Sequence, residues 1–205
     1  SVPTAMDALF RRFGENLEPE DILIMNDPFD GGMHIPDIFI VKPVFWQNER
    51  VAFAVSTAHH SDLGGRVAGS SACDNVDIFQ DGFRIPWLKL YRKGIPDNAI
   101  FSLIEANVRT PRVTIGDLRA QIAACNIGER AVHDLIRRYG LGTFRHCAAD
   151  LIEYTEQRLR AEISSWPDGT YSFTDYMDTD GTGGPPVCIH VTLTVAGDSL
   201  IVDFT

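Results

Sequence analysis

Several segments that would assign the protein to a special class are missing from its sequence. The longest apolar runs fall short of the roughly 18 residues that a membrane-spanning helix requires. The first fifteen residues lack the basic-then-apolar order of a secretory signal, and no Asn-x-Ser/Thr glycosylation signal occurs. These absences predict a protein with no membrane partner and a cytoplasmic location.

Cysteine and basic residues are both in short supply. The four cysteines form no C-x-x-C pair, so a thiolate zinc site is not expected, and free thiols fit a reducing cytosol. They are Cys73, Cys125, Cys147 and Cys188. Cys125 and Cys147 fall in helical patterns, where we expect them to be small buried hydrophobes. With 18 basic against 28 acidic residues, the formal net charge of −10 argues against nucleic acid as a partner.

The remaining composition is that of an ordinary globular protein, with 44% hydrophobic and 22% charged residues in a chain of 205. This length suits one large domain or two small ones. The sequence has no phosphate-binding G-x-x-x-x-G-K-[ST] loop, no H-E-x-x-H helix and no internal repeat. Its function therefore has to be sought in less common motifs.

Strand-like and helix-like patterns come in blocks, which predicts an α+β fold with mixed or antiparallel sheet elements and a helical segment in the middle. Residues 1–96 form a sheet region, residues 97–166 a helical region and residues 167–205 a second sheet region. We expect helices at 4–13, 97–108, 114–140 and 143–166, and strands at 21–27, 37–46, 49–60, 170–178 and 187–205. The chain stops directly after a strand, so we expect it to be one portion of a longer protein.

Two H-x-x-D motifs lie at the ends of two neighbouring expected strands. His34 and Asp37 open the strand 37–46, whereas His59 and Asp62 close the strand 49–60. A three-residue connection predicts that these strands pair as a hairpin, which brings both motifs to one rim of the sheet. Imidazole and carboxylate are ligands for divalent transition metals. Spacing alone leaves two interpretations open, a metal site or surface histidines with aspartate partners.

The loop before the first motif is stiffened, and the second motif contains a histidine pair. Gly31 and Gly32 allow a close backbone approach, while Pro36 fixes one dihedral angle. Because successive residues of a strand point to opposite faces, only one of His59 and His60 is expected to face the shared rim.

Several long segments resemble the hydantoinase B family, which includes oxoprolinase-type subunits and, more distantly, large subunits of acetone and acetophenone carboxylases. They are "ILIMNDPFDGGMHIPDIFIVKPVF", "STAHHSDLGG" and "IPWLKLYRKG…NVRTPRVTIGDLRAQIAACNIGER". The resemblance covers nearly the whole chain. It implies that the 205 residues are part of a catalytic subunit that works with an ATP-using partner, the hydantoinase A-type subunit, in a hetero-oligomer.

The resemblance also implies roles for individual residues. In the carboxylase branch the large chain carries manganese, and the corresponding ligands here are His34, Asp37 and His59, joined by a glutamate upstream of Ser1. Asp62 would then orient a ligand or touch substrate, and His60 would shuttle protons. Three arginines in family-like segments would either bind an anionic intermediate or form ordinary surface ion pairs. They are Arg84, Arg109 and Arg119.

The expected function is therefore a metal-dependent subunit (Mn, Fe or Zn) of an ATP-dependent enzyme of hydantoinase or 5-oxoprolinase type that opens a cyclic amide. The missing phosphate loop fits an ATP site on the partner. One alternative is a subunit of an ATP-dependent ketone carboxylase, and another is a non-catalytic assembly module that only docks the partner.

Overall fold

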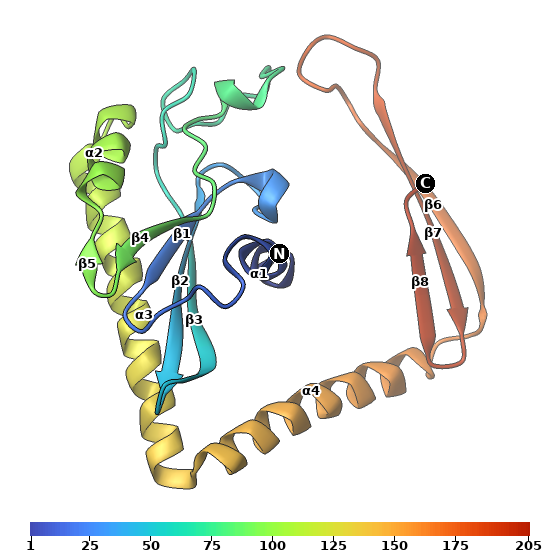
Figure 1. Cartoon of the computed structure of the whole chain (residues 1–205). Helices are drawn as coiled ribbons and strands as arrows, with labels where there is room; N and C mark the ends of the chain where they lie inside the picture. The colour runs from blue at the N-terminus through green and yellow to red at the C-terminus, as the bar shows by residue number, and fades with distance from the viewer. The chain divides into compact units, whose positions relative to one another are not determined.

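The computed structural model describes all residues 1–205 and has the expected α+β architecture, with four α-helices and two antiparallel sheets (Figure 1). The helices are α1 (Val2–Phe13), α2 (Asn98–Asn107), α3 (Pro111–Tyr139) and α4 (Leu141–Ile163), and short 3-10 helices are η1 (Pro28–Asp30) and η2 (Ile78–Gln80). The strands are β1 (Ile22–Met25), β2 (Asp37–Trp46), β3 (Glu49–His59), β4 (Leu88–Arg92), β5 (Ile95–Pro96), β6 (Gly169–Met177), β7 (Val187–Ala196) and β8 (Ser199–Asp203). None of the helices combines the length and apolar character needed to cross a membrane.

The chain forms two compact units, Ser1–Asp134 and Leu135–Thr205. The boundary falls inside α3, so the helical region that the sequence marks at 97–166 is shared between the units. Each unit has its own sheet, and the two are described separately below.

The first unit is a five-stranded sheet, in the order β3-β2-β1-β4-β5, with helices on both faces. Alternate residues of β1 and β2 point to opposite sides, as the period of a strand requires. Leu23 and Phe39 pack with α1 on one face, while Ile24 and Ile40 pack with α2 and α3 on the other. Both faces of the central strands are therefore buried, and the rim of the sheet is the part left open for a site.

The hairpin of β2 and β3 has the antiparallel pairing that the sequence predicts. Its ladder runs from Trp46 opposite Glu49 to Asp37 opposite His59. The turn residues Gln47 and Asn48 both have positive φ angles, 50° and 65°, as tight hairpin turns require. The register shifts between Val44 and Phe45, directly after Pro43, which confirms the expected bulge in this strand.

The helix signals are largely confirmed. The Asp97 side chain accepts a hydrogen bond from the Ala99 backbone and caps α2, and Gly140 separates α3 from α4. Cys125 is buried as expected, but the expectation for Cys147 is wrong, because its side chain is exposed. The reason is that α4 contributes only Ile163 to a packed interior, so most of its faces have no partner in this structure.

The second unit contains α4 and a three-stranded sheet in the order β6-β7-β8. Gly197, with φ of 60°, lies in the expected tight turn between β7 and β8. The strands pair in full register, yet among their side chains only Val195 is buried. This unit consequently has complete backbone pairing and almost no apolar core.

Candidate metal centre

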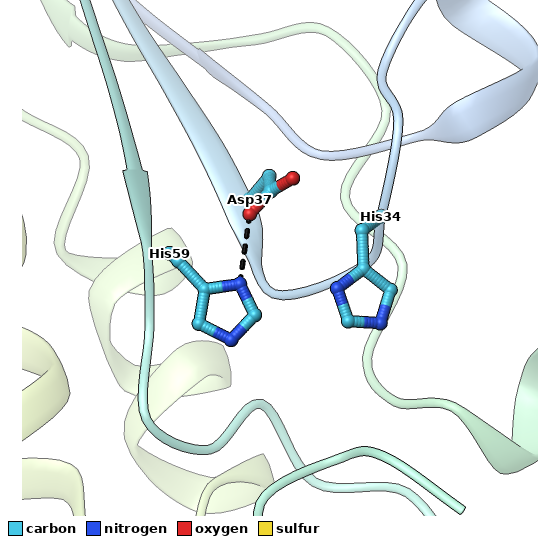
Figure 2. Close-up of side chains that lie close together, drawn as sticks. All are labelled: His34, Asp37 and His59. Atoms are coloured by element: carbon cyan, nitrogen blue, oxygen red, sulfur yellow. Dashed lines mark hydrogen bonds and ion pairs between the residues drawn. The ribbon is translucent and has the colours of Figure 1, made fainter. Parts of the chain in front are cut away.

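The hairpin register places the carboxylate of one motif against the imidazole of the other. Asp37 is the first residue of β2 and lies opposite His59, the last residue of β3. The His59 Nδ1 atom lies 2.9 Å from Asp37 Oδ1, which makes a hydrogen bond at the rim (Figure 2). The His59 side chain is largely exposed, whereas the Asp37 side chain is mostly covered. The expectation that the two H-x-x-D motifs meet at one rim is therefore confirmed for these two residues.

His34 reaches the same rim from the loop that precedes β2. Its carbonyl accepts a hydrogen bond from the Asp37 amide at 2.9 Å, so the loop turns directly into the strand. The His34 and His59 rings stack at a centroid distance of 5.4 Å and an interplanar angle of 21°. Figure 2 shows the two rings and the Asp37 carboxylate arranged around one open space.

Close backbone packing explains the two glycines before His34. Gly31 has φ of 92°, and a Cβ atom there would lie 2.5 Å from the backbone nitrogen of Ala5 in α1. A Cβ atom on Gly32 would lie 2.7 Å from the Asp27 carbonyl oxygen. A side chain at either position would displace backbone, so the glycines fix the path that leads to His34.

The three side chains fit a divalent ion by distance and by chemistry. One ligand atom from each of His34, Asp37 and His59 lies within 4.8 Å of the other two, and no other group of His, Cys, Asp and Glu in the chain meets this test. Two imidazole nitrogens and one carboxylate oxygen, without sulfur, suit Mn, Fe or Zn. Three protein ligands also leave coordination positions open, as catalytic sites require.

His60 points away from this rim, as the alternation of strand residues predicts. Its side chain is completely buried, and its Nε2 atom lies 2.9 Å from Gln121 Oε1 on α3. The ring therefore does not reach the exposed side of the cluster formed by His34, Asp37 and His59. A proton-shuttle role for His60 stays a prediction without support from its position.

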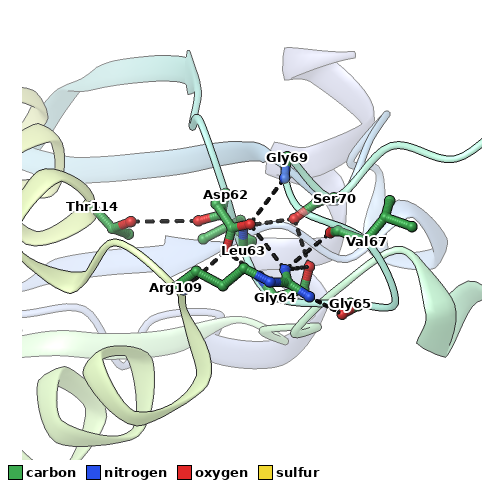
Figure 3. A network of polar contacts seen from close by, with 9 residues as sticks. All are labelled: Asp62, Leu63, Gly64, Gly65, Val67, Gly69, Ser70, Arg109 and Thr114. Atoms are coloured by element: carbon green, nitrogen blue, oxygen red, sulfur yellow. Dashed lines mark hydrogen bonds and ion pairs between the residues drawn. The ribbon is translucent and has the colours of Figure 1, made fainter.

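Asp62 lies in a buried network that shapes the loop after β3 (Figure 3). Its two oxygens accept hydrogen bonds from the amides of Gly64, Gly69 and Arg109 and from the Arg109 guanidinium, at 2.9–3.0 Å. Burial by itself raises the pKa of Asp62, but these four hydrogen bonds outweigh it and lower the pKa to about 2. The expected hydrogen bond from the His59 ring to Asp62 is not formed, because Asp37 takes that position and both Asp62 oxygens have other donors.

The three arginines proposed to bind substrate have different surroundings. The Arg109 guanidinium donates to Asp62 and to the carbonyls of Gly64, Gly65 and Val67, so it is engaged in holding the loop. Its position favours the ion-pair interpretation over anion binding, which nevertheless stays untested.

Arg84 and Arg119 are more open. The Arg84 guanidinium lies over the exposed rings of Phe29 and Phe79, at 5.8 and 5.4 Å, and beside Asp27 at 3.4 Å. Arg119 lines a surface cavity of about 320 Å³ with Phe101 of α2, and no contact joins it to the metal-site residues. Of the three, Arg84 follows a loop that starts from the same part of the sheet, and its substrate role stays a prediction.

Sequence reasoning missed Gln121. Its buried carboxamide contacts His60 and the backbones of both β2 and β3. A glutamine among apolar residues on the inner face of a helix was the available signal, because buried polar groups normally have hydrogen-bond partners.

Comparison with known proteins gives the wider class. The family model described as hydantoinase B/oxoprolinase matches residues 1–205. The chain belongs to the hydantoinase B/oxoprolinase family, as its long motifs had indicated.

Individual relatives agree with this assignment. The chain is 36% identical over 190 residues to a putative D-/L-hydantoinase of Pseudomonas sp. (strain NS671), in its B-type chain, covering 90% of this chain and 32% of that protein. It is 34% identical over 198 residues to the caprolactamase beta subunit of Pseudomonas jessenii, covering 97% and 34%. The chain thus spans about a third of the length of these curated relatives.

Solved structures show the same fold. The crystal structure of the ATP-dependent caprolactamase from Pseudomonas jessenii matches with a TM-score of 0.93 at 34% identity, covering 98% of this chain and 34% of that one. A nucleotide-free acetone carboxylase structure matches with a TM-score of 0.88 over 99% of this chain and 29% of that one. At 22% identity, the second likeness concerns the fold alone.

Proposed function

We propose that this chain forms the metal-binding catalytic part of an ATP-dependent enzyme that opens a cyclic amide. The observation that carries the proposal is the convergence of His34, Asp37 and His59 within 4.8 Å at an open rim of the sheet. Family membership supplies the reaction class, since relatives carry the names hydantoinase, caprolactamase and 5-oxoprolinase.

The chain's own residues would act as follows. His34 and His59 supply imidazole nitrogens, and Asp37 supplies a carboxylate oxygen that also orients the His59 ring through Nδ1. A divalent ion held by them supplies Lewis acidity, which polarises a carbonyl group or activates water. The largely exposed His59 side chain leaves this side of the cluster accessible to a small substrate.

The ATP step is assigned to another subunit of a hetero-oligomer, of hydantoinase A type. This chain carries no phosphate-binding loop of the G-x-x-x-x-G-K-[ST] kind, and the relatives are named as subunits. We therefore expect no ATP hydrolysis by the isolated chain and ATP-dependent turnover only with its partner.

A second candidate is a subunit of a ketone carboxylase. The likeness to the acetophenone carboxylase delta subunit, 22% identical over 205 residues, keeps this candidate open. The higher identities to hydantoinase and caprolactamase subunits favour hydrolysis. Bicarbonate dependence of turnover separates the two, and an absence of metal would favour a non-catalytic assembly module.

The metal site is tested by ion content. We expect about one equivalent of divalent ion in the protein purified without chelator. His34→Ala, Asp37→Ala and His59→Ala should each lose most of it, because removing one of three ligands leaves too few to hold the ion. Elemental analysis of the folded variants measures this directly.

His146→Ala is the matched control. His146 also lies beside a carboxylate, Asp150 at 3.4 Å, but on α4 and outside the cluster. Its loss should leave the ion in place. Full ion content in all three ligand variants would contradict the site.

The reaction is tested with the partner subunit present. Hydantoin, 5-oxoproline and caprolactam form a panel of cyclic amides, and ring opening is followed with and without ATP and bicarbonate. Ring opening that needs ATP but no bicarbonate supports the proposal. Turnover of ketones that needs bicarbonate would instead support the carboxylase.

A further inference from the structure

A buried glutamine joins α3 to the rim that carries the proposed ligands. The Gln121 Nε2 atom donates to the Ile38 carbonyl of β2 at 2.9 Å and to the Ser56 carbonyl of β3 at 3.2 Å. Its Oε1 atom lies 2.9 Å from His60 Nε2. The carboxamide therefore uses both of its hydrogens and its oxygen, and it is almost completely removed from solvent.

These contacts fix the tautomer of His60. Because Gln121 Nε2 faces two carbonyl oxygens, its Oε1 must be the atom that faces the imidazole. An oxygen can only accept, so His60 Nε2 carries the proton. The other ring nitrogen, Nδ1, is buried without a partner. Gln121 is consequently the single polar anchor of the His60 side chain.

The anchored positions are adjacent to the proposed ligands along the chain. Ile38 directly follows Asp37, and His60 directly follows His59. The His60 amide also donates to the Pro36 carbonyl at 2.8 Å, which ties the end of β3 to the residue before Asp37. Gln121 thus holds the two strand ends from behind, on the face of the sheet opposite to the one on which the His59 ring lies.

We propose that Gln121, acting through His60, is a positioning residue that sets the spacing between Asp37 and His59. The inference rests on the proposed metal function and adds to it a residue from a helix far along the sequence. A shift of one strand end relative to the other would move two ligands apart, and ion binding is sensitive to such shifts. Neither residue touches the ion or the substrate.

The test measures metal affinity and the ligand field in the intact protein. Gln121→Met keeps the length of the side chain and removes all three hydrogen bonds. We expect about a 10-fold loss of Co²⁺ and Mn²⁺ affinity, at the lower end for residues that support metal ligands indirectly, and a changed Co²⁺ visible spectrum. Gln121→Glu retains an acceptor for His60 but opposes two carbonyl oxygens, so it should not restore binding.

Leu118→Ala is the control for a general loss of stability. Leu118 is fully buried on the same helix one turn earlier, so its truncation loosens the core but leaves the carboxamide contacts intact. This variant should bind Co²⁺ with the wild-type spectrum. Wild-type affinity and spectrum in Gln121→Met would overturn the inference and leave the metal site standing. Failure of the wild-type protein to bind either ion would overturn both.

Discussion

The carboxyl group of Asp62 is the single residue on which most of the loop after β3 depends. Its partners Gly64 and Gly69 follow closely in the chain, whereas Arg109 lies 47 residues further on. Figure 3 shows the guanidinium and the loop carbonyls gathered around it. The carboxylate thereby closes a loop that lacks regular structure of its own, and a change at this residue should act on stability before it acts on chemistry.

Asp62→Asn should lower the free energy of unfolding by about 2 kcal/mol at pH 7. The pKa falls from 3.8 to about 2 on folding, and each pKa unit corresponds to roughly 1.4 kcal/mol. Because the folded pKa is depressed, this stabilisation is present above about pH 4 and is lost as the pH falls toward 2. Urea unfolding of wild type and variant between pH 2 and 7 should show the two curves converging at the acid end.

Asp74→Asn is the control in the same loop. Asp74 is exposed and forms an ion pair with Arg66 at the surface, so its loss should change stability little. Since Asp62 does not touch the His59 ring, Asp62→Asn should also retain the ion. A variant that unfolds like wild type, or that loses the ion as completely as His59→Ala, would show that Asp62 has another role.

Part of this site was accessible from the sequence at the residue scale. Strand alternation correctly separated an exposed His59 from a buried His60, and the paired motifs pointed to His34 and Asp37. The links from Asp62 to Arg109 and from His60 to Gln121 were not accessible. They join residues 47 and 61 positions apart, and no local period encodes which distant side chain fills a gap in the packing.

Among the elements, β2 and α3 are joined by a buried cation. Lys42 lies within an apolar strand and is only 2% exposed. Its Nζ atom contacts carboxylates of Glu129 at 2.6 Å and Glu20 at 2.9 Å, and the amide oxygen of Asn126 at 2.9 Å. Burial by itself lowers the pKa of Lys42, but the hydrogen bonds to Glu129 and Glu20 outweigh it and raise the pKa. The charge is therefore retained at neutral pH in spite of burial.

Lys42→Met should destabilise the protein by about 3 kcal/mol, because it leaves the poorly exposed Glu129 carboxylate without its cation. The raised folded pKa means that this contribution is complete at pH 7 and is lost only in strongly alkaline solution. Thermal and urea unfolding at pH 7 measure the effect.

Lys42→Met combined with Glu129→Leu should recover most of the lost stability, since an apolar pair can replace a buried ion pair. Equal and additive losses in the two single variants and the double variant would mean that the ion pair contributes nothing of its own.

Element boundaries followed the sequence closely where periodicity was strong. The hairpin of β2 and β3, the cap at Asp97 and the break at Gly140 were all foreseen. Cys147 was misjudged for a physical reason. An amphipathic pattern shows which helix face is apolar, but it does not show whether another element covers that face.

On the scale of the whole molecule, apolar burial is concentrated in residues 1–134. Both hydrophobic clusters of the sheet and its helices belong to this unit. In residues 135–205 the buried apolar side chains are Ile136, Ile163 and Val195, while many large apolar side chains are exposed. Folding must offset roughly 1 to 2 kcal/mol of backbone entropy per residue, which so small a core does not supply.

A segment of residues 135–205 made alone should therefore lack cooperative folding. We expect a far-UV circular dichroism signal that changes gradually with temperature, and poorly dispersed amide proton resonances. Residues 1–134 are the comparison and should unfold in one sharp transition. A sharp transition in the isolated 135–205 segment would show that its backbone pairing suffices without a core.

The register of the hairpin limits how this part of the gene can change in length. Ten pairs of residues separate the Gln47–Asn48 turn from Asp37 and His59, a span of roughly 30 Å at the usual rise per strand residue. A single codon gained or lost between Asp37 and His59 would pair Asp37 with a neighbour of His59 and turn every following side chain to the opposite face. Only compensated changes, which lengthen or shorten both strands by two residues, would preserve the pairing and the direction of the ligands. A short turn at one end of the ladder thus restricts the inherited length variation that the opposite end can survive.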